Sequence, residues 1–228
     1  MNDDYKYRKL TLKSKLKTTP ILQKRIEKRT KCVVQPCNEP TIYASSYCHK
    51  HRMCQKWSGS PFASLTELRV IAETLKGTAK TTLTSSTSDQ LAFQRACNGV
   101  KRFSQNYYKT DAKTILKYRR HWANPYKARL ALWMSLQTRK PEELLETALG
   151  AAMHIYIYRD DLAVTEQHVT KLLAKTMACV VVPATFSQGE KTCAGRLLVN
   201  ILDDCYSAKY WRRRLLENTI KSENNNGG

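Results

Sequence analysis

Hydrophobic residues recur every three or four positions over most of the chain after residue 63, which is the period of one face of an α-helix. The clearest run is Leu65, Leu68, Ile71, Ala72 and Leu75. Ser64 stands directly before this run and Glu67 follows Ser64 by three residues, the spacing of a capping box at a helix N-terminus. Ser187 and Glu190 have the same spacing ahead of a later apolar run. The pattern predicts a mainly α-helical fold.

Proline and capping residues divide the rest of this region into further helices. We expect helices over about residues 89–108, 111–124, 125–138, 141–158 and 165–179, and a helical stretch from 188 to about 221 that breaks near residues 206–207. The alternative for residues 180–182, three valines before Pro183, is a short strand. Residues 76–88 are small and polar, so we expect a linker or long loop there. The tail at residues 222–228 is rich in Asn and Gly and is expected to be disordered.

Four residues of metal-ligand type follow the pattern Cys32-x4-Cys37-x10-Cys48-x2-His51. Zinc prefers four tetrahedral nitrogen and sulfur ligands, and two chelating pairs supply them at low conformational cost. Cys48 and His51 are one helical turn apart, so both side chains can face one ion. The spacing predicts a structural Zn²⁺ site, and a closed four-ligand site has no open position for a catalytic water. The alternative is a group of unrelated cysteines beside a surface histidine.

Two nearby residues are rival ligands. His49 directly follows Cys48 and points elsewhere if the segment is helical. Cys54 lies about one turn beyond His51 and is the stronger rival. The choice between His51 and Cys54 as the fourth ligand stays open at this point.

The same segment resembles a known type of module. The residues are CVVQPCNEP at 32–40, YCHKH at 47–51, and Trp57-x-Gly59-x-Pro61. They are similar to the short zinc segment that accompanies many bacteriophage HNH homing endonucleases and phage DNA-binding proteins. The chain departs from that pattern at Arg52, where Tyr is usual, and at residues 54–55, where an Arg and an aromatic residue are expected. The resemblance is confined to residues 32–61 and implies a phage or mobile-element setting with a DNA-binding role.

Together these features predict the domain organisation. We expect a basic leader at residues 1–30 with a short helix over 21–29, and a treble-clef-like or zinc-ribbon-like module at 31–61. An all-α helical domain should follow at 62–221. The fold class is therefore mainly α with a small N-terminal zinc module.

Charge is unevenly distributed along the chain. The chain has 39 Lys+Arg against 19 Asp+Glu, a net charge of +20. Residues 1–60, 61–140 and 141–228 carry net charges of +10, +11 and −1, so the first 140 residues hold all of the excess. A field of this sign is typical of proteins that bind a polyanion. We expect a nucleic acid, with DNA favoured over RNA by the resemblance, and no membrane partner.

Two groups of cations are candidate phosphate contacts. In the zinc module they are Lys50, Arg52 and Lys56, with Trp57 beside them. We expect Trp57 to pack under the loop, although stacking on a base is the alternative. The second group interleaves with aromatic residues at 113–129 and comprises Arg119, Arg120, Lys127 and Arg129. An ordinary amphipathic helix with a solvated cationic face is the alternative for this second group.

The near-neutral residues 141–221 favour a different role. They could bind a protein partner or self-associate, and the chain would then be an adaptor tethered to nucleic acid by its basic half. The two apolar helices over about 142–158 and 165–179 have the order of a helix-turn-helix, but the second helix offers only Lys171 and Lys175 as cations. The run Arg212–Arg214 is either a phosphate clamp or a solvated helix end.

We expect no enzymatic activity. A divergent metal-dependent nuclease would need a second metal site, and the candidates are His154, Asp160, Asp161 and His168. An acidic break between two helices explains these residues more simply. No phosphate-binding loop or dinucleotide fingerprint is present in the sequence.

The sequence also gives expectations about location. The first residues are polar, and no run approaches about 18 apolar residues, so we expect neither a signal peptide nor a membrane span. Four of the eight cysteines cluster between residues 32 and 54, which favours metal ligation in a reducing compartment over a disulfide framework. For a phage-encoded protein this compartment is the host bacterial cytoplasm or nucleoid.

Overall fold

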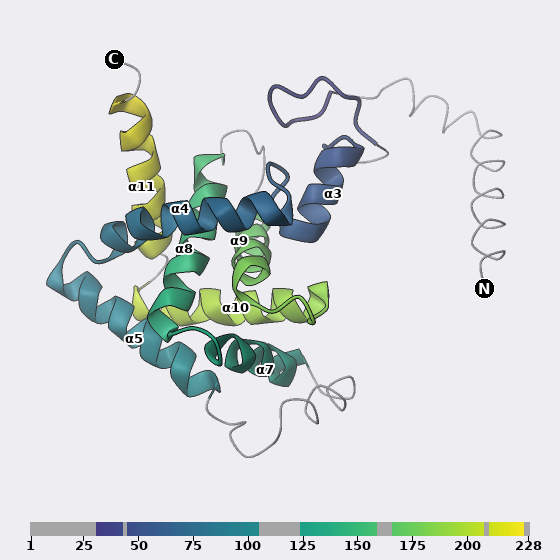
Figure 1. The fold of residues 1–228 in the computed structure, drawn as a ribbon. Helices are drawn as coiled ribbons and strands as arrows, with labels where there is room; N and C mark the ends of the chain where they lie inside the picture. The colour runs from purple at the N-terminus through teal and green to yellow at the C-terminus, as the bar shows by residue number, and fades with distance from the viewer. Residues whose placement is uncertain (1–30, 43–44, 105–123, 159–165, 208–209, 226–228) are drawn as a thin grey trace, which may run out of the picture. The chain divides into compact units, whose positions relative to one another are not determined.

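The computed structural model describes residues 31–42, 45–104, 124–158, 166–207 and 210–225 (Figure 1). The expected leader at 1–30 and the expected helix at 111–124 lie outside the described residues. The described part contains eight α-helices and no β-strand, which confirms the mainly α fold. The helices are α3 (His49–Ser58), α4 (Leu65–Leu83), α5 (Thr87–Ser104), α7 (Asn124–Leu136), α8 (Pro141–Ile157), α9 (Glu166–Val181), α10 (Gln188–Cys205) and α11 (Tyr210–Asn225).

The chain forms two compact units, Met1–Arg52 and Met53–Gly228. The boundary between the two units falls within α3, whereas the sequence pattern predicts a boundary after residue 61. Residues 53–61 group with the second unit because the turn after α3 is packed inside that unit. Ser58, Gly59 and Ser60 are all buried there.

In the second unit, α8 is the central helix. It packs against both α4 and α9, and α9 also packs on α10 (Figure 1). The helix α7 packs chiefly against α10 and α5. Leu144, Leu145, Leu149 and Ile155 of α8 are fully buried. Such all-round burial is typical of a helix in the interior of a domain.

The helices α9 and α10 approach closely at Gly195. A Cβ atom on this residue would collide with the backbone of Ala174 in α9. Gly195 therefore has no room for a side chain, and the two helices come together backbone to backbone at this point.

The expected linker at residues 76–88 is wrong. The helix α4 runs without a break to Leu83, and only a short turn separates it from α5. Ala79 and Leu83 are fully buried and continue the stripe begun by Leu68 and Ala72. Burial of this stripe outweighs the weak helix propensity of the intervening threonines, whose hydroxyls bond to carbonyl oxygens one turn back.

Other expected boundaries have mixed outcomes. Both capping boxes are present, with Ser64 and Glu67 bonded reciprocally and Ser187 and Glu190 likewise. The expected break near residues 206–207 is also present. The strand considered for residues 180–182 is absent, because α9 continues through Val181 with its valines buried in the unit. The expectation of a disordered tail at 222–228 is wrong for residues 222–225, which belong to α11, and residues 226–228 lie outside the described residues.

Candidate metal centre and cationic surfaces

The first two ligand residues are held by a tight loop of the first unit. The Cys32 N–H donates to the Glu39 carbonyl at 3.0 Å, next to an isolated antiparallel bridge between Lys31 and Pro40. The Cys37 N–H donates to the Val34 carbonyl at 2.8 Å and closes a turn. These bonds bring the two cysteine side chains to one side of the loop.

The second pair lies at the start of α3. The Arg52 N–H donates to the Cys48 carbonyl at 2.9 Å, so Cys48 opens the helix and His51 follows one turn later. The Val33 N–H donates to the Ser46 carbonyl at 3.0 Å and ties this segment to the first loop. A helix carrying the second pair agrees with the treble-clef-like alternative, because a ribbon would place that pair in a hairpin.

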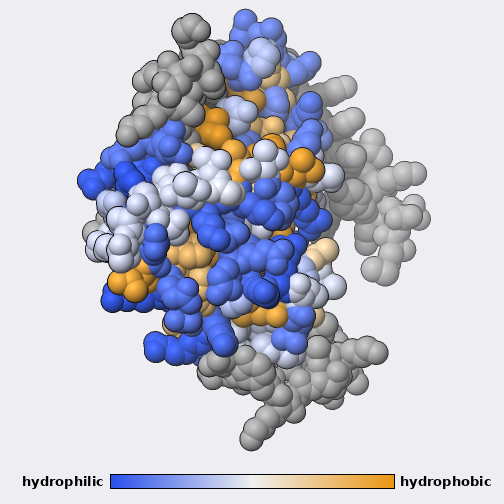
Figure 2. All heavy atoms as spheres, turned by 60° about the vertical axis from the view of Figure 1, so that its left-hand side comes forward, coloured by the Kyte–Doolittle hydropathy of each residue, from blue (hydrophilic) through white to orange (hydrophobic). Residues whose placement is uncertain are grey.

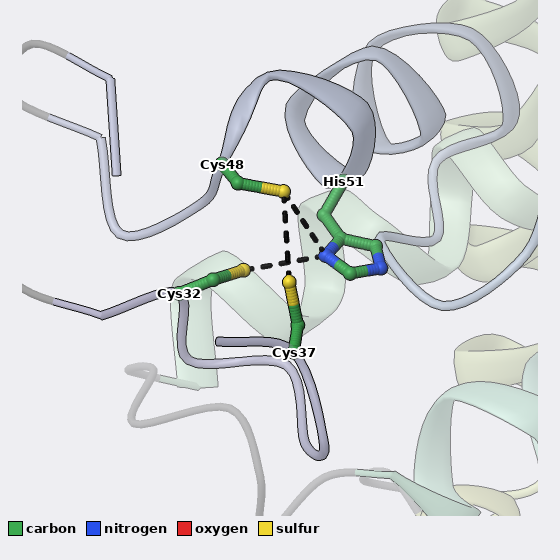
Figure 3. Close-up of side chains that lie close together, drawn as sticks. All are labelled: Cys32, Cys37, Cys48 and His51. Carbon is green, nitrogen blue, oxygen red and sulfur yellow. Dashed lines mark hydrogen bonds between the residues drawn. The ribbon is translucent and has the colours of Figure 1, made fainter. Parts of the chain in front are cut away.

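The four side chains converge on one point (Figure 3). One potential ligand atom from each of Cys32, Cys37, Cys48 and His51 lies within 4.8 Å of the others. The His51 Nδ1 atom is 3.3 Å from the Cys32 sulfur and 3.4 Å from the Cys48 sulfur. The Cys37 and Cys48 sulfurs are 3.9 Å apart. This arrangement can hold a metal ion.

The surroundings of Cys48 and His51 favour the protonation states in which these side chains bind metals. Burial disfavours the Cys48 thiolate, but hydrogen bonds from the backbone N–H of His51, from the neighbouring thiols and from the N–H of Lys50 outweigh it and lower the Cys48 pKa. Burial, together with the positive charge of Lys50, also lowers the His51 pKa and keeps the ring neutral at pH 7. A thiolate and a neutral imidazole are the forms that bind metals.

Cys37 behaves differently from Cys48. The backbone N–H of Glu39 favours its thiolate, yet burial and the two nearby thiols outweigh that bond and raise the Cys37 pKa. Three close thiols cannot all ionise easily without a cation between them. The cluster therefore gains most from binding a positively charged ion.

The rival ligands are not part of this group. Among the described residues, the cluster consists of Cys32, Cys37, Cys48 and His51, without His49 or Cys54. His49 is exposed. The geometry selects His51 as the fourth ligand.

The exposed side of α3 is cationic. His49, Lys50, Arg52, Lys56 and Trp57 are exposed, whereas His51 and Ser58 are not. At 100° per residue the five exposed residues fall on one contiguous arc, and His51 and Ser58 fall on the opposite side. We call this arc the α3 cationic face. Within the described residues none of its three Lys and Arg side chains forms a salt bridge.

The expectation that Trp57 packs under the loop is wrong. Its side chain is 52% exposed, and the Lys56 ammonium lies 4.8 Å from the centre of its ring. What packs is its backbone, whose carbonyl accepts a hydrogen bond from the Cys179 thiol of α9. The anchored backbone leaves the indole ring facing solvent.

The Gly-x-Pro segment at residues 59–61 ends α3. Gly59 has φ +85°, a left-handed conformation that favours glycine, and a Cβ there would lie 2.6 Å from the Thr176 hydroxyl oxygen of α9. Ser58 supports the turn through its hydroxyl oxygen, which lies within hydrogen-bond distance of the Ser60 and Ala63 carbonyl oxygens, at 2.9 and 2.7 Å. This segment of the resemblance thus has a structural role within the helical unit.

The second group of predicted cations is only partly described. Arg119 and Arg120 lie outside the described residues. Lys127 and Arg129 lie near the start of α7 and are half-buried. The Arg129 guanidinium sits 5.6 Å from the ring centre of Phe103 in α5. Arg129 therefore packs on α5, and it does not belong to the freely solvated cationic face considered for residues 113–129.

Sequence reasoning overlooked the cations of α5. Arg95, Lys101 and Arg102 are exposed there, while its carboxylate, Asp89, is buried. The available signal was the helical spacing of these cations with no acidic residue between them. It was missed because the region is less basic than residues 113–129.

The C-terminal helices supply the interior of the second unit. Most of α9 from Val169 onwards is buried, so this helix is not free to enter a DNA groove as a recognition helix. Arg212 is 8% exposed, forms an ion pair with Asp203 and donates to the Thr170 hydroxyl at 2.9 Å. The run Arg212–Arg214 is therefore neither a phosphate clamp with three free arginines nor a helix end with three solvated ones.

His154 belongs to the interior as well. Its Nε2 atom lies 3.1 Å from the hydroxyl oxygen of Ser60, and both residues are buried. Burial lowers the His154 pKa to about 4. Asp160 and Asp161 lie outside the described residues. A histidine and serine this deep cannot reach a substrate, so their pairing is a packing feature.

Comparison of the chain with protein-family models, curated proteins and solved structures finds no match. Among the described residues, no helix is long and apolar enough to cross a membrane.

Proposed function

We propose that this protein is a zinc-containing nucleic-acid-binding protein, with duplex DNA as the favoured target. The observation that carries the proposal is the α3 cationic face, which lies on the helix that contains His51 of the metal cluster and directly follows Cys48. A metal that fixes the start of α3 also fixes the positions of Lys50 and Arg52.

The spacing of the ligand atoms supports zinc as the metal. Tetrahedral zinc, with Zn–S bonds of about 2.3 Å and a Zn–N bond of about 2.0–2.1 Å, separates two sulfurs by about 3.8 Å and a sulfur from a nitrogen by about 3.6 Å. The corresponding separations are 3.9 Å for Cys37 and Cys48 and 3.3–3.4 Å for the sulfur–nitrogen pairs. Three thiolates and one imidazole also form a donor set that suits zinc.

The charge of the chain supports a nucleic acid as partner. Its net charge is +20, and the cations of the α3 cationic face form no salt bridge within the described residues. Lys and Arg that lack carboxylate partners can neutralise phosphates and release the counterions that surround DNA. Trp57 adds an exposed ring that can stack on a base. DNA is favoured by the resemblance of residues 32–61 to phage DNA-binding modules.

The direct test replaces Lys50, Arg52 and Lys56 together by alanine in the zinc-loaded chain. Each neutralised phosphate contributes about −0.9 to the slope of log K against log salt, so the slope should flatten by up to about 2.7. The matched control is Lys76→Ala, Lys80→Ala and Arg213→Ala, which removes the same charge from side chains already paired with Glu73, Glu146 and Glu217.

The two triple variants separate local contact from total charge. The proposal expects the control to keep most of the slope of the unchanged protein. Equal slopes for both variants would show that α3 has no special place in binding. Zinc content and helicity are measured first to exclude loss of the fold.

A further inference from the structure

The exposed side of α5 is a second cationic surface among the described residues. Arg95, Lys101 and Arg102 project from it together with the amide side chain of Asn98. None of the three cations forms a salt bridge within the described residues. Figure 2 turns the side of Figure 1 that holds α5 towards the viewer, and hydrophilic side chains cover most of that face. The hydrophobic side chains there are scattered, so a charged partner suits this face better than an apolar one.

A groove runs between α5 and α10 beside these cations. It is lined by Arg95, Asn98, Gly99, Arg102, Phe103, Ile201, Asp204 and Cys205. Arg129 of α7 adds a further positive charge at this end, because its guanidinium lies over the Phe103 ring. Asp204 is the one carboxylate among the lining residues. The groove is therefore cationic on balance.

Cys205 is the last residue of α10 and lies in the α10 wall of the groove, next to Asp204. Burial and the Asp204 carboxylate raise the pKa of this thiol, whereas Arg95 lowers it. Charged groups of both helices therefore act on this thiol. Residues of both helices line this groove, so one ligand in it can contact both.

The spacing of the arginines suits a phosphodiester chain. Arg95 and Arg102 are seven residues apart, which is about 10 Å along a helix axis at 1.5 Å per residue. The two arginines are therefore far enough apart to contact two different phosphates of one DNA strand. Arginine forks suit phosphate oxygens, and the Asn98 amide between them can donate to the same backbone.

We propose that the α5–α10 groove is a second DNA-backbone site, in which Arg95 and Arg102 contact phosphates of one strand. This inference rests on the proposed function and identifies a surface apart from α3. It assigns the helical unit a positioning role in binding, because contacts to phosphates fix register and carry no base readout.

The test measures duplex-DNA affinity of the full, zinc-loaded chain across a range of salt concentrations. Arg95→Ala with Arg102→Ala should flatten the slope of log K against log salt by about 1.8, or 0.9 for each lost phosphate. Arg95→Lys with Arg102→Lys keeps both charges and should keep the slope. Lys76→Ala with Arg213→Ala is the matched control, since it removes the same charge from paired side chains.

The test is completed by a substitution that removes a negative charge from the groove. Asp204→Asn removes the groove carboxylate and should tighten DNA binding by about two- to five-fold, as expected for one exposed charge. The exposed Glu143 of α8 lies outside the residues that line the groove, so Glu143→Gln makes the same net change elsewhere and should have a smaller effect.

The measurements distinguish failure of the groove proposal from failure of the proposed function. If the unchanged chain binds DNA and the Arg95–Arg102 alanine pair keeps its slope, the groove is not a DNA site, although the proposed function stands. If the unchanged chain does not bind DNA at all, the proposed function fails and the groove proposal fails with it. Vesicles containing anionic lipid serve as the competing polyanion. A loss of vesicle binding without a loss of DNA binding in the alanine pair would overturn the proposal in favour of a lipid surface.

Discussion

At the scale of single residues, His154 has a defined effect on stability. Burial lowers its pKa to about 4, whereas an unfolded histidine has a pKa of about 6.5. As pH falls below about 6.5, His154 binds a proton in the unfolded chain but stays neutral in the folded chain. The stability contributed by the neutral ring is therefore fully present above about pH 6.5 and is lost towards pH 4.

We expect His154→Gln to reduce this pH dependence. Between pH 7 and pH 5 the unchanged chain should lose about 2 kcal/mol of unfolding free energy through this one group, and the variant should lack that loss. Urea unfolding at both pH values, with zinc at fixed excess, gives the difference between the two proteins. The same loss in both proteins would mean that His154 is protonated in the folded state.

Trp57 gives a second prediction for a single residue. Its exposed ring can stack on an unpaired base, which contributes about 1–3 kcal/mol, so Trp57→Ala should weaken single-stranded DNA binding by about five-fold or more. Trp57→Phe keeps an aromatic face and should retain most of the affinity. Fluorescence anisotropy with a labelled oligonucleotide measures both variants. Unchanged affinity in Trp57→Ala would leave the ring without a role in stacking.

Residue types and spacing predicted the four residues of the metal cluster, but they did not predict which nearby side chains are exposed. Cys32, Cys37, Cys48 and His51 were predicted because a four-ligand site needs a restricted set of spacings. The exposure of Trp57 was not predictable, since it depends on how the Cys179 thiol of α9 holds the Trp57 backbone. Contacts between distant segments leave no local signal in the sequence.

At the scale of elements, we expect the order of residues 31–42 and 45–48 and of the start of α3 to depend on a bound metal ion. In the described part of this unit, few apolar side chains are buried besides the ligands, among them Val34 and Tyr47. A structural zinc contributes about 10–16 kcal/mol of apparent binding free energy in small modules, which replaces a missing core.

We expect Cys48→Ser to release the metal and disorder the first unit, while Cys54→Ser keeps one zinc per chain. Cys48 is a member of the cluster and Cys54 is not, so the pair is a matched comparison of two cysteines on one segment. Elemental analysis gives the zinc content, and amide hydrogen exchange reports order in residues 31–52. Retained zinc in Cys48→Ser, or its loss in Cys54→Ser, would move the ligand set away from the one described.

Helix starts were more predictable than helix lengths. The capping boxes at Ser64 and Ser187 are local patterns, and both are present. The continuation of α4 to Leu83 depends on burial of Ala79 and Leu83 in the unit, which propensity does not reveal. Polar, threonine-rich composition was therefore a poor guide to a linker.

At the scale of the whole molecule, charge and folding units do not coincide. The excess charge lies in residues 1–140, so charge alone predicts that a fragment ending near Thr138 keeps most DNA affinity. Such a fragment would lack α8, whose side chains fill the interior of the helical unit beside α4 and α9. The cut would unfold the surfaces that carry the charge, so substitutions in the full chain are the appropriate test.

We propose that the folded chain binds the phosphate backbone through both the α3 cationic face and the α5–α10 groove. The most direct measurement is the equilibrium constant of the full, zinc-loaded chain for duplex DNA as a function of salt concentration. Contacts by Lys50, Arg52, Lys56, Arg95 and Arg102 predict a slope of log K against log salt of about −4 to −5. A slope between 0 and about −1, or no binding at about 50 mM salt, would contradict the account.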